Sequence, residues 1–515
     1  MTFYLTTPIY YVNDIPHLGH AYSTIIADTL NRYHKLFGEE TFLLTGTDEH
    51  GQKVQNAAKA RNLDPQVHVD ELVVRFQNTW KELSVGPDFF VRTTMDFHKE
   101  AVSRVLQELF DKGEIYLHEY EGWYSVSEEI FYTDKDLVNG KSPDGKEVQK
   151  VVEKNYFFRM SKYQEKLIKY VEENPTFILP DGKRSEVLGF LRQPLNDLCI
   201  SRPKARLAWG IELPFDKEYV TYVWFDALIN YLSAIGYKQG AEKEKLYTKL
   251  WPHAVHLIGK DILVPHCIYW PTMLMAMGVS LPKTIFAHGW LLNAASAKMS
   301  KSVGPVIGPA EAVEWLGVDC FRYCLCREIP LGNDAPFSKE IAISRVNAEL
   351  ANNLGNLLSR ASNLVAKYFD GKLPSATSNL DETKELTKIA ISTGAMVKKE
   401  IVELRPHIAI EHVVNLLNAT NKYIDTLAPW KRAKTDLPGA GETLYTALEV
   451  LRVVGILLTP VMPTKMAAML KQLGWNETPK LADTEKWGLL KSGTPCGKPE
   501  PLFPRLENAV VSANQ

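Results

Sequence analysis

The chain has 515 residues, of which 45% are hydrophobic, and 59 Lys and Arg against 61 Asp and Glu give a formal net charge of -2. This length exceeds what one hydrophobic core supports, so we expect roughly three or four domains. The balanced charge excludes a global basic field for nucleic acid, so any contact with RNA must be local. The six cysteines form no C-x-x-C pair, which excludes a disulfide framework and a zinc site of that kind.

The N-terminal segment MTFYLTTPIYYVND has no basic residue before its apolar residues, so it predicts neither a secretory signal nor a transit peptide. No uninterrupted apolar run approaches the roughly 20 residues that cross a bilayer. We therefore expect a soluble, cytoplasmic protein with reduced thiols.

The first hundred residues alternate β-rich runs with helical patterns. Residues 3–9 predict a strand, residues 21–38 an amphipathic helix that Gly38 ends, and residues 41–51 the next strand. Strand, helix and strand of these lengths predict a parallel sheet with right-handed crossovers. Residues 122–215 then change to short strands and polar turns, which indicates an insertion. The apolar strands in HAVHLIGKDI and KTIFAHGW resume the α/β pattern, so the sheet is split in sequence but whole in space.

Beyond residue 334 nearly every segment has a helical pattern, which predicts a separate all-α bundle. The predicted helices are 340–368, 382–404, 408–427, 442–458 and 463–473. The fold class is therefore α/β, a doubly wound parallel (Rossmann-like) sheet split by an insertion domain, followed by an all-α helical bundle. The expected division is 1–115 and 221–290 for the two halves of the sheet domain, 116–220 for the insertion, 291–340 for a lysine-rich loop and its flanking region, 341–485 for the bundle and 486–515 for a tail.

Two short motifs carry the chemistry. The first, PHLGH at Pro16 to His20, lies at the turn between the first strand and its helix. Gly19 permits close approach of the backbone, and the first N–H groups of a helix favour an anion, toward which His17 and His20 would add donors. The alternative is that both histidines only cap the helix. Metal binding is disfavoured, because no obvious third ligand lies nearby.

The second motif is SAKMSKSVGPVIG, residues 296–308, which combines lysines, hydroxyl groups and glycines. Lysine presents a point charge and glycine lets backbone N–H groups reach oxygens, so this composition suits a polyphosphate. The alternative is a solvated surface turn.

PHLGH and KMSKS in this order resemble the two signatures of class I aminoacyl-tRNA synthetases. The segments TTPIYYVNDIPHLGHAY, LTGTDEHG, YVWFDALINYLSA, HLIGKDILVPHCIYWPTMLMA and FAHGWLL together resemble the methionyl-tRNA synthetase family, from about Phe3 to Trp430. The resemblance implies a methionine–tRNA ligase, which activates L-methionine with ATP and transfers methionyl to the 3′-terminal adenosine of tRNA(Met). Class membership implies the 2′-hydroxyl as first acceptor.

The resemblance also implies site residues. Those implied for catalysis are His17, His20, Lys298 and Lys301. Those implied for ATP, with Mg²⁺ on its phosphates, are His17, Gly19, His20, Gly259, Asp261, Lys298, Met299, Ser300, Lys301 and Ser302. Those implied for methionine are Ile9, Tyr11, Trp224, Ala227, Leu228, Tyr231, Ile262, His266 and Trp270, with Asp48 on its ammonium group. A thioether packs well against aromatic rings, and Tyr231 could donate a hydrogen bond to the sulfur. Taken singly, the two tryptophans are more often core aromatics.

In the helical region, the resemblance implies that Asn356, Arg360 and Trp430 read a CAU anticodon. Unpaired bases stack on aromatic rings and bond to amide or guanidinium groups. The alternative is that the three residues simply join the bundle.

The chain departs from the family pattern in two places. Many relatives carry C-x-x-C pairs in zinc knuckles of the insertion, but YSVSEE at residues 124–129 and the later GKSPDGK loop contain no cysteine, so we expect no zinc. The tail is too short for the C-terminal barrel of some relatives, so we expect a monomer. PLFPRLE, residues 501–507, resembles a segment that folds back toward the catalytic half. Two competing functions are a free-standing nucleotidylyltransferase, which leaves the helices unexplained, and a non-catalytic RNA-binding protein, against which the two intact motifs argue.

Overall fold

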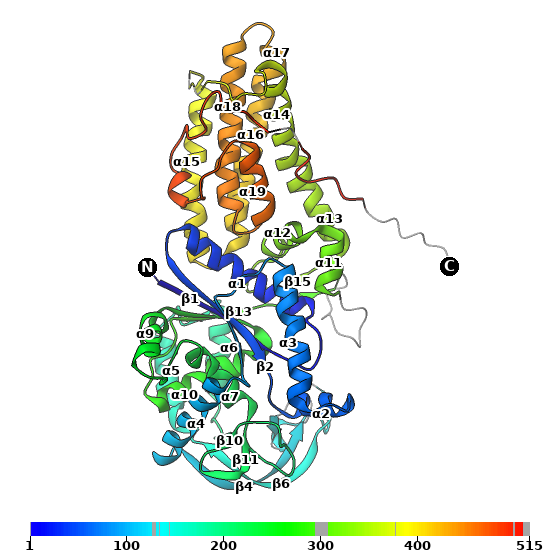
Figure 1. Ribbon diagram of the computed structural model, residues 1–515. Coiled ribbons are helices and arrows are strands. Elements are labelled where there is room, and N and C mark those ends of the chain that lie inside the picture. Colours follow the sequence, from blue (N-terminus) through cyan, green and yellow to red (C-terminus); the bar gives the residue numbers. More distant parts are fainter. Residues whose placement is uncertain are drawn as a thin grey trace, which may run out of the picture.

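The computed structural model describes residues 2–125, 130–132, 134–143, 145–293, 307–375, 377, 379–497 and 500–507. Figure 1 shows two regions stacked end to end, with helix α1 (Leu18–Leu36) between them. We call the region up to Leu292 the sheet part, and the region from Lys339 onward the helical part.

One sheet of six parallel strands organises the sheet part. Its order is β3 (Phe89–Arg92), β2 (Glu40–Asp48), β1 (Thr2–Tyr11), β12 (Ala254–Gly259), β13 (Thr284–His288) and β7 (Ile178–Leu179). The four predicted strands are confirmed, and the halves of the split sheet meet where β1 pairs with β12. The strands β3 and β7 are too short to show a periodicity of their own.

Alternating side chains place a core on each face of the sheet, as a doubly wound fold requires. Phe3 and Leu5 of β1 face one core, with α1 and α3 (Pro65–Glu82), while Tyr4 between them faces the other. The second core also contains side chains of α4 (Asp96–Asp111) and α10 (Trp270–Met277).

The register of β1 against β2 shifts between Thr6 and Ile9, where Pro8 has no N–H to donate. Pairing then resumes, so that Tyr11 lies opposite Asp48 at the carboxyl ends of the two strands. Ligands of open parallel sheets bind at this edge.

The insertion forms two small antiparallel sheets. One has the order β5 (Ile130–Tyr132), β4 (Ile115–Ser125), β6 (Gln149–Phe158) and β8 (Leu198–Cys199); the other has β10 (Glu212–Leu213), β11 (Asp216–Thr221) and β9 (Ser201–Pro203). The region also contains α5 (Gln164–Glu173), α6 (Asp181–Leu191) and β7, which joins the main sheet. The guanidinium of Arg202 lies 5.2 Å from the ring of Tyr124 and 4.8 Å from that of Tyr222, which ties the sheets together. Within the described ranges, no group of three or more His, Cys, Asp or Glu residues could hold a metal ion.

Shorter elements complete the sheet part and lead out of it. They are α2 (Gln52–Ala60), α7 (Val223–Leu228), α8 (Asn230–Ser233), α9 (Ala241–Leu250), a π-helical turn (Pro265–Tyr269), β14 (Leu291–Leu292) and β15 (Ala335–Pro336), with the connecting helices α11 (Pro309–Leu316) and α12 (Val318–Glu328).

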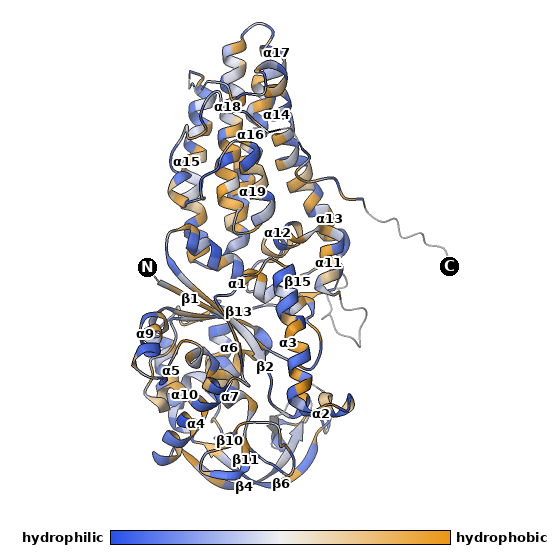
Figure 2. Ribbon diagram, in the orientation of Figure 1, coloured by the Kyte–Doolittle hydropathy of each residue, from blue (hydrophilic) through white to orange (hydrophobic). Residues whose placement is uncertain are grey.

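The helical part confirms the predicted bundle. It contains α13 (Lys339–Arg345), a π-helical stretch (Val346–Gly355), α14 (Asn356–Tyr368), α15 (Asp381–Val402), α16 (Pro406–Leu427), α17 (Pro429–Arg432), α18 (Leu437–Leu458) and α19 (Pro463–Gln472). Helix α18 begins five residues before the predicted start, because the carboxylate of Asp436 accepts from the N–H of Gly439 at 2.9 Å and caps it. From Gly439 onward α18 is buried all round, and Figure 2 shows the apolar residues along it.

The described end of the chain returns to the bundle. Leu502 and Phe503 are buried, and the side-chain amide of Asn347 exchanges two hydrogen bonds, of 2.8 and 2.9 Å, with the backbone of Leu506. No helix among the described residues is long and apolar enough to span a membrane.

Candidate active site

The PHLGH turn caps α1. The N–H groups of Gly19 and His20 donate to Nδ1 of His17 at 3.1 and 3.4 Å, and the N–H of His17 donates to Nδ1 of His20 at 3.4 Å. The two imidazoles stack with their centroids 3.5 Å apart. In this structure both histidines therefore cap the helix, and the N–H groups that an anion would use are held by the His17 ring. An anion can bind them only if that ring turns away.

His20 lies against Tyr10, with ring centroids 4.6 Å apart, and against Phe76 at 5.8 Å. Burial and the neighbouring His17 hold the pKa of His20 well below its usual value. The ring is therefore neutral at pH 7. Since its Nδ1 accepts from the backbone, the proton lies on Nε2, which is a donor suited to a phosphoryl oxygen.

His288, at the end of β13, connects the sheet to α1. Its Nδ1 donates to the carbonyl of Gly289 at 2.8 Å, so its Nε2 accepts from the hydroxyl of Ser23 at 2.7 Å. Burial lowers the pKa of His288, which keeps it neutral in this role. The sequence motifs do not predict this contact, although the strand ending in His-Gly is a signal for it.

The IGKD turn lies at the same edge of the sheet, because β12 neighbours β1. A Cβ on Gly259 would lie 2.6 Å from Oδ1 of Asp261, so glycine leaves room for that carboxylate. The exposed Asp261 accepts from the indole N–H of Trp290 at 3.3 Å. Lys260 pairs with Asp334 at 2.6 Å and lies 4.0 Å from the Trp290 ring centroid.

The predicted lysine loop, Lys298 to Ser302, lies outside the described residues. Along the chain, the last described element before it is β14, which ends at Leu292, and the next one after it is α11, which begins at Pro309. The prediction that a triphosphate is held from two sides therefore stays a prediction.

Several residues predicted to line methionine form one cluster, in which Tyr231, His266 and Trp270 are buried and Trp224 and Ile262 are half-buried. Nδ1 of His266 donates to the carbonyl of Ile262 at 2.9 Å, so its Nε2 accepts from the hydroxyl of Tyr231 at 2.8 Å. Trp224 lies with its ring centroid 6.1 Å from that of His266, and Trp270 lies 6.0 Å from Tyr231. Burial lowers the pKa of His266 to about 4, so this imidazole is neutral at physiological pH.

The hydroxyl of Tyr231 already has a partner in this structure. A tyrosine hydroxyl has one proton, and that of Tyr231 is donated to His266, so the predicted hydrogen bond to a sulfur atom requires that proton to change partner. The polar edge of Trp270 is also occupied, because its indole N–H donates to Nε2 of His256 at 3.2 Å. Nδ1 of His256 then donates to the hydroxyl of Thr6 on β1 at 2.8 Å. The aromatic faces are thus fixed by hydrogen bonds among the residues themselves.

The other predicted methionine contacts lie at nearby strand and helix ends. Ile9 and Tyr11 are half-buried at the end of β1, and Asp48, at the end of β2, is 4% exposed. Ala227 and Leu228 are buried on the same short helix, α7, as Trp224.

A buried carboxylate that the sequence motifs do not predict joins these elements. Asp226 on α7 accepts from Nδ1 of His50 at 2.6 Å and from Nε2 of His98 at 2.8 Å. Burial alone would raise the pKa of Asp226, but the charge and hydrogen bonds of the two histidines outweigh burial and lower it. This hydrogen-bonded cluster holds the segment after Asp48 against the helix that carries Trp224. The polar residues inside LTGTDEHG and YVWFDALINYLSA were its only sequence signal.

A cleft of about 560 Å³ opens between the insertion and α2. Its lining residues are Asn13, Lys53, Asn56, Ala57, Tyr124, Glu147, Val148 and Gln149. The ammonium of Lys53 lies 5.1 Å from the ring centroid of Tyr11, so the cleft adjoins the candidate methionine site.

The predicted anticodon readers gather at one place in the helical part. Arg360 donates to Asp425 at 2.6 Å, and its guanidinium lies 5.4 Å from the ring centroid of Trp430. Asn356 is exposed one helical turn before Arg360. Trp430 is on α17, which lies at the end of the bundle remote from the sheet (Figure 1).

The chain is similar to known proteins over nearly its whole length. The family model described as tRNA synthetases class I (M) matches residues 3–150 and 135–362, and the anticodon binding domain of methionyl tRNA ligase matches residues 374–515. The methionine–tRNA ligase of Caldanaerobacter subterraneus subsp. tengcongensis is 45% identical over 509 residues, which are 98% of this chain and 79% of that protein. The chain belongs to the methionyl-tRNA synthetase family.

Other members are similarly close. The methionine–tRNA ligase of Bacillus subtilis is 45% identical over 528 residues, covering 98% of this chain and 78% of that protein. Among solved structures, a methionyl-tRNA synthetase of Mycobacterium tuberculosis in complex with methionyl-adenylate superposes with a TM-score of 0.93 at 38% identity, over 98% of this chain and 100% of that one. The apo form of that synthetase superposes with a TM-score of 0.86 at 36% identity, over 98% of each chain.

Proposed function

We propose that this protein is a methionine–tRNA ligase, which joins L-methionine to the 3′-terminal adenosine of tRNA(Met) in two steps. The observation that carries the proposal is the match to methionyl-tRNA synthetases over nearly the whole chain. The buried aromatic and imidazole cluster at the carboxyl edge of the sheet and the Arg360–Trp430 pair at the far end of the bundle support it. The relative bound to methionyl-adenylate supports the use of ATP.

In the first step, a carboxylate oxygen of methionine bonds to the α-phosphorus of ATP, and pyrophosphate leaves. Negative charge grows on the phosphoryl oxygens, so the enzyme has to position the reactants and stabilise that charge. We assign this role to the Nε2–H of His20, to the N–H groups of Gly19 and His20 after His17 has turned away, and to Lys298 and Lys301. Mg²⁺ bound to the phosphates would supply further positive charge.

The remaining small-molecule contacts follow the predicted residues. Asp261 accepts from the ribose hydroxyls, beside the backbone of Gly259, and Asp48 holds the ammonium group of methionine. Side chains of the Trp224, Tyr231, His266 and Trp270 cluster enclose the thioether, for which contacts with ring edges contribute about 0.3 to 1.5 kcal/mol.

In the second step, a hydroxyl of the terminal adenosine attacks the mixed anhydride and AMP leaves. We assign recognition of the CAU anticodon to Asn356, Arg360 and Trp430, and we propose that the enzyme acts as a monomer. Arg360 has to exchange its partner Asp425 for RNA when the anticodon binds.

Two assays in sequence test the proposal. ATP/pyrophosphate exchange is measured with each amino acid in turn, and charging of a tRNA with a CAU anticodon follows. We expect exchange with methionine and then charging. Exchange without charging would support a nucleotidylyltransferase that does not use RNA, and no exchange with any amino acid would support a non-catalytic RNA-binding protein.

The variant Lys301→Ala tests the role of the lysine loop. We expect it to slow adenylate formation far more than it weakens methionine binding, because the lysine acts on charge that appears only in the transition state. Pre-steady-state adenylate formation and equilibrium methionine binding measure the two effects, and equal losses in both would contradict this role.

A further inference from the structure

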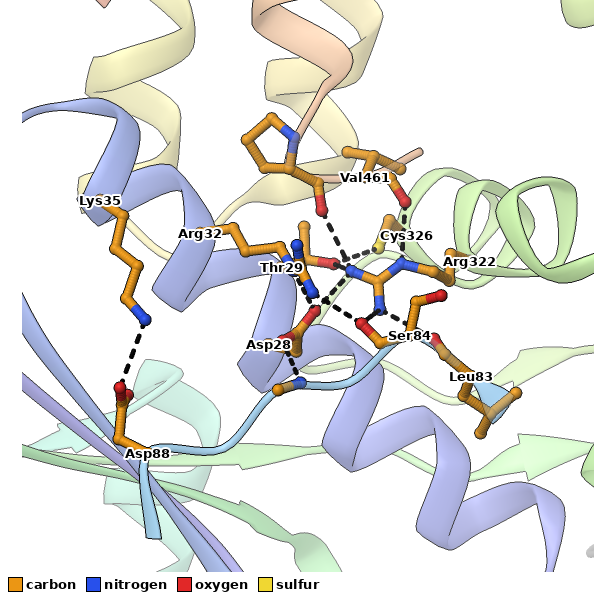
Figure 3. Close-up of polar contacts among 12 residues, drawn as sticks. Asp28, Thr29, Arg32, Lys35, Leu83, Ser84, Asp88, Arg322, Cys326 and Val461 are labelled. Carbon is orange, nitrogen blue, oxygen red and sulfur yellow. Dashed lines mark hydrogen bonds and ion pairs between the residues drawn. The ribbon is translucent and has the colours of Figure 1, made fainter. Parts of the chain in front are cut away.

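A single buried arginine joins the two parts of the molecule. Arg322 on α12 has no exposed side-chain surface, and its guanidinium donates in two directions (Figure 3). Toward the sheet part, Nη2 donates to the carboxylate of Asp28 on α1 at 2.7 Å, and Nη1 donates to the carbonyl of Leu83 at 3.2 Å. Toward the helical part, Nε donates to the carbonyl of Val461 at 2.9 Å, and Nη2 to that of Pro460 at 3.1 Å.

The carboxylate that Arg322 meets is itself fixed. Asp28 also accepts from Nε of Arg32 at 2.6 Å and from the N–H of Gly86 at 3.0 Å. A buried ion pair repays its desolvation only when its other hydrogen-bonding positions are filled, as they are here. The geometry of the pair is therefore rigid.

A second residue of α12 holds the same corner of the helical part. Asp319, one turn before Arg322, accepts from the N–H of Lys465 in the first turn of α19 at 2.5 Å. Both side chains lie on one face of α12 and bond to the turn between α18 and α19 and to the start of α19. We call this region the α18–α19 corner. We call Asp28, Asp319, Arg322 and the carbonyls of Pro460 and Val461 the junction.

The position of the junction connects it to the chemistry. Helix α1 carries His17 and His20 at its N-terminus, and Asp28 lies eight residues after His20, which is about 12 Å along the helix. The α18–α19 corner belongs to the bundle that carries Arg360 and Trp430. The junction therefore fixes the candidate phosphate site and the candidate anticodon face to each other.

We propose that Arg322 is a positioning residue for methionyl transfer, which holds the helical part against α1 so that one tRNA reaches both sites at once. This inference rests on the proposed function. A tRNA bound at its anticodon end presents its acceptor end to the active site at an effective concentration that the geometry between the two sites determines. A looser junction lowers that concentration without changing either site.

Lysine cannot replace arginine here. The guanidinium has five donors in a planar fork and reaches a carboxylate on one side and carbonyls on the other, whereas an ammonium group is a point at the end of a flexible chain. Arg322→Lys keeps the positive charge that Asp28 requires, but it cannot bond at the same time to Asp28 and to the carbonyls of Pro460 and Val461. It is therefore the variant that tests the junction with least damage to the fold.

The experiment compares two RNA substrates for Arg322→Lys. One is a full tRNA with a CAU anticodon, and the other is a hairpin with only its acceptor stem and 3′ end. We expect kcat/KM for the full tRNA to fall about 10-fold or more, while charging of the hairpin and ATP/pyrophosphate exchange stay within about 2-fold, because only the full tRNA uses both sites.

Arg452→Lys is the matched control. Arg452 is equally buried, but its partners, Glu449 and the carbonyls of Asp483 and Lys486, all lie in the helical part. We expect this variant to lower the melting temperature and to leave the ratio of full-tRNA to hairpin charging unchanged. A purely structural role of Arg322 would give the same result for both variants.

An unchanged ratio in Arg322→Lys, or equal losses with both RNAs, would overturn the inference. If that variant is insoluble, the double variant Asp28→Asn with Arg322→Gln removes the buried charges together, and the same ratio decides in the same way. Absence of methionine-dependent exchange in the unaltered protein would instead overturn the proposed function.

Discussion

The candidate amino-acid pocket and the candidate anticodon face are built in opposite ways. In the pocket, Tyr231, His266 and Trp270 are buried and hydrogen-bonded to one another or to the sheet. On the anticodon face, Arg360 and its partner Asp425 keep 34% and 61% of their side-chain surface exposed. A small thioether therefore meets walls that are already in place, whereas unpaired bases meet side chains that can still change partners. Substitutions in the pocket should consequently lower the stability of the protein as well as its activity. Substitutions on the anticodon face should lower activity and leave stability nearly unchanged.

The largest effect is expected from Trp270→Ala. This side chain is fully buried and bonded to His256, so its removal should lower the free energy of unfolding by about 3 to 5 kcal/mol. Methionine-dependent exchange should be lost as well. Urea unfolding and the exchange assay measure the two effects, and a cost below about 1 kcal/mol would show that the pocket walls are not part of the core.

The pH dependence of the free energy of unfolding should also come partly from a residue of the pocket, His266. The pKa of His266 is lowered to about 4 by burial, whereas an unfolded chain binds this proton near pH 6.5. Between these values the unfolded state binds more protons, so stability falls as the pH falls, by about 3 kcal/mol in total for this residue.

His266→Asn supplies the control for this prediction. Unfolding curves measured at several pH values below 6.5 give the slope of the free energy of unfolding against pH. This slope should be smaller for the variant, by the equivalent of up to one proton taken up on unfolding. His256 and His288, whose pKa values burial also lowers, should account for part of the slope that remains. Identical slopes for the variant and the unaltered protein would mean that His266 is not held neutral.

Trp430→Ala is the tryptophan-to-alanine substitution on the anticodon face that corresponds to Trp270→Ala in the pocket. Trp430 is only partly buried, so the free energy of unfolding should change by about 1 kcal/mol or less. Exchange should be unaffected, but charging should fall about 10- to 100-fold, because one stacked base contributes about 1 to 3 kcal/mol. A loss of exchange together with charging would break the contrast between the two regions.

The smallest effect is expected from Asp425→Asn. The exposed ion pair with Arg360 contributes about 0 to 1 kcal/mol, so stability should hardly change. The freed guanidinium should bind tRNA up to a few-fold more tightly, with a stronger dependence on salt. Filter binding at two salt concentrations measures this, and weaker binding would show that Asp425 assists RNA directly.

Much of the site was predictable where a motif coincides with a strand or helix end. PHLGH, IGKD and the Trp224 and Trp270 segments all occur there, and their neighbourhood follows from the parallel order of β1 and β12. What could not be predicted is which atoms bond to which. The capping role of His17 and the hydrogen bond that occupies the Tyr231 hydroxyl depend on distances between elements far apart in the chain.

The sequence by itself determined the class of fold and the family, because hydrophobic periodicity and short motifs are local properties that survive without coordinates. Only the tertiary structure decided the buried polar partners. The clusters around Asp226 and Arg322 join residues from separate segments, and burial makes each such pair depend on geometry that no single segment contains.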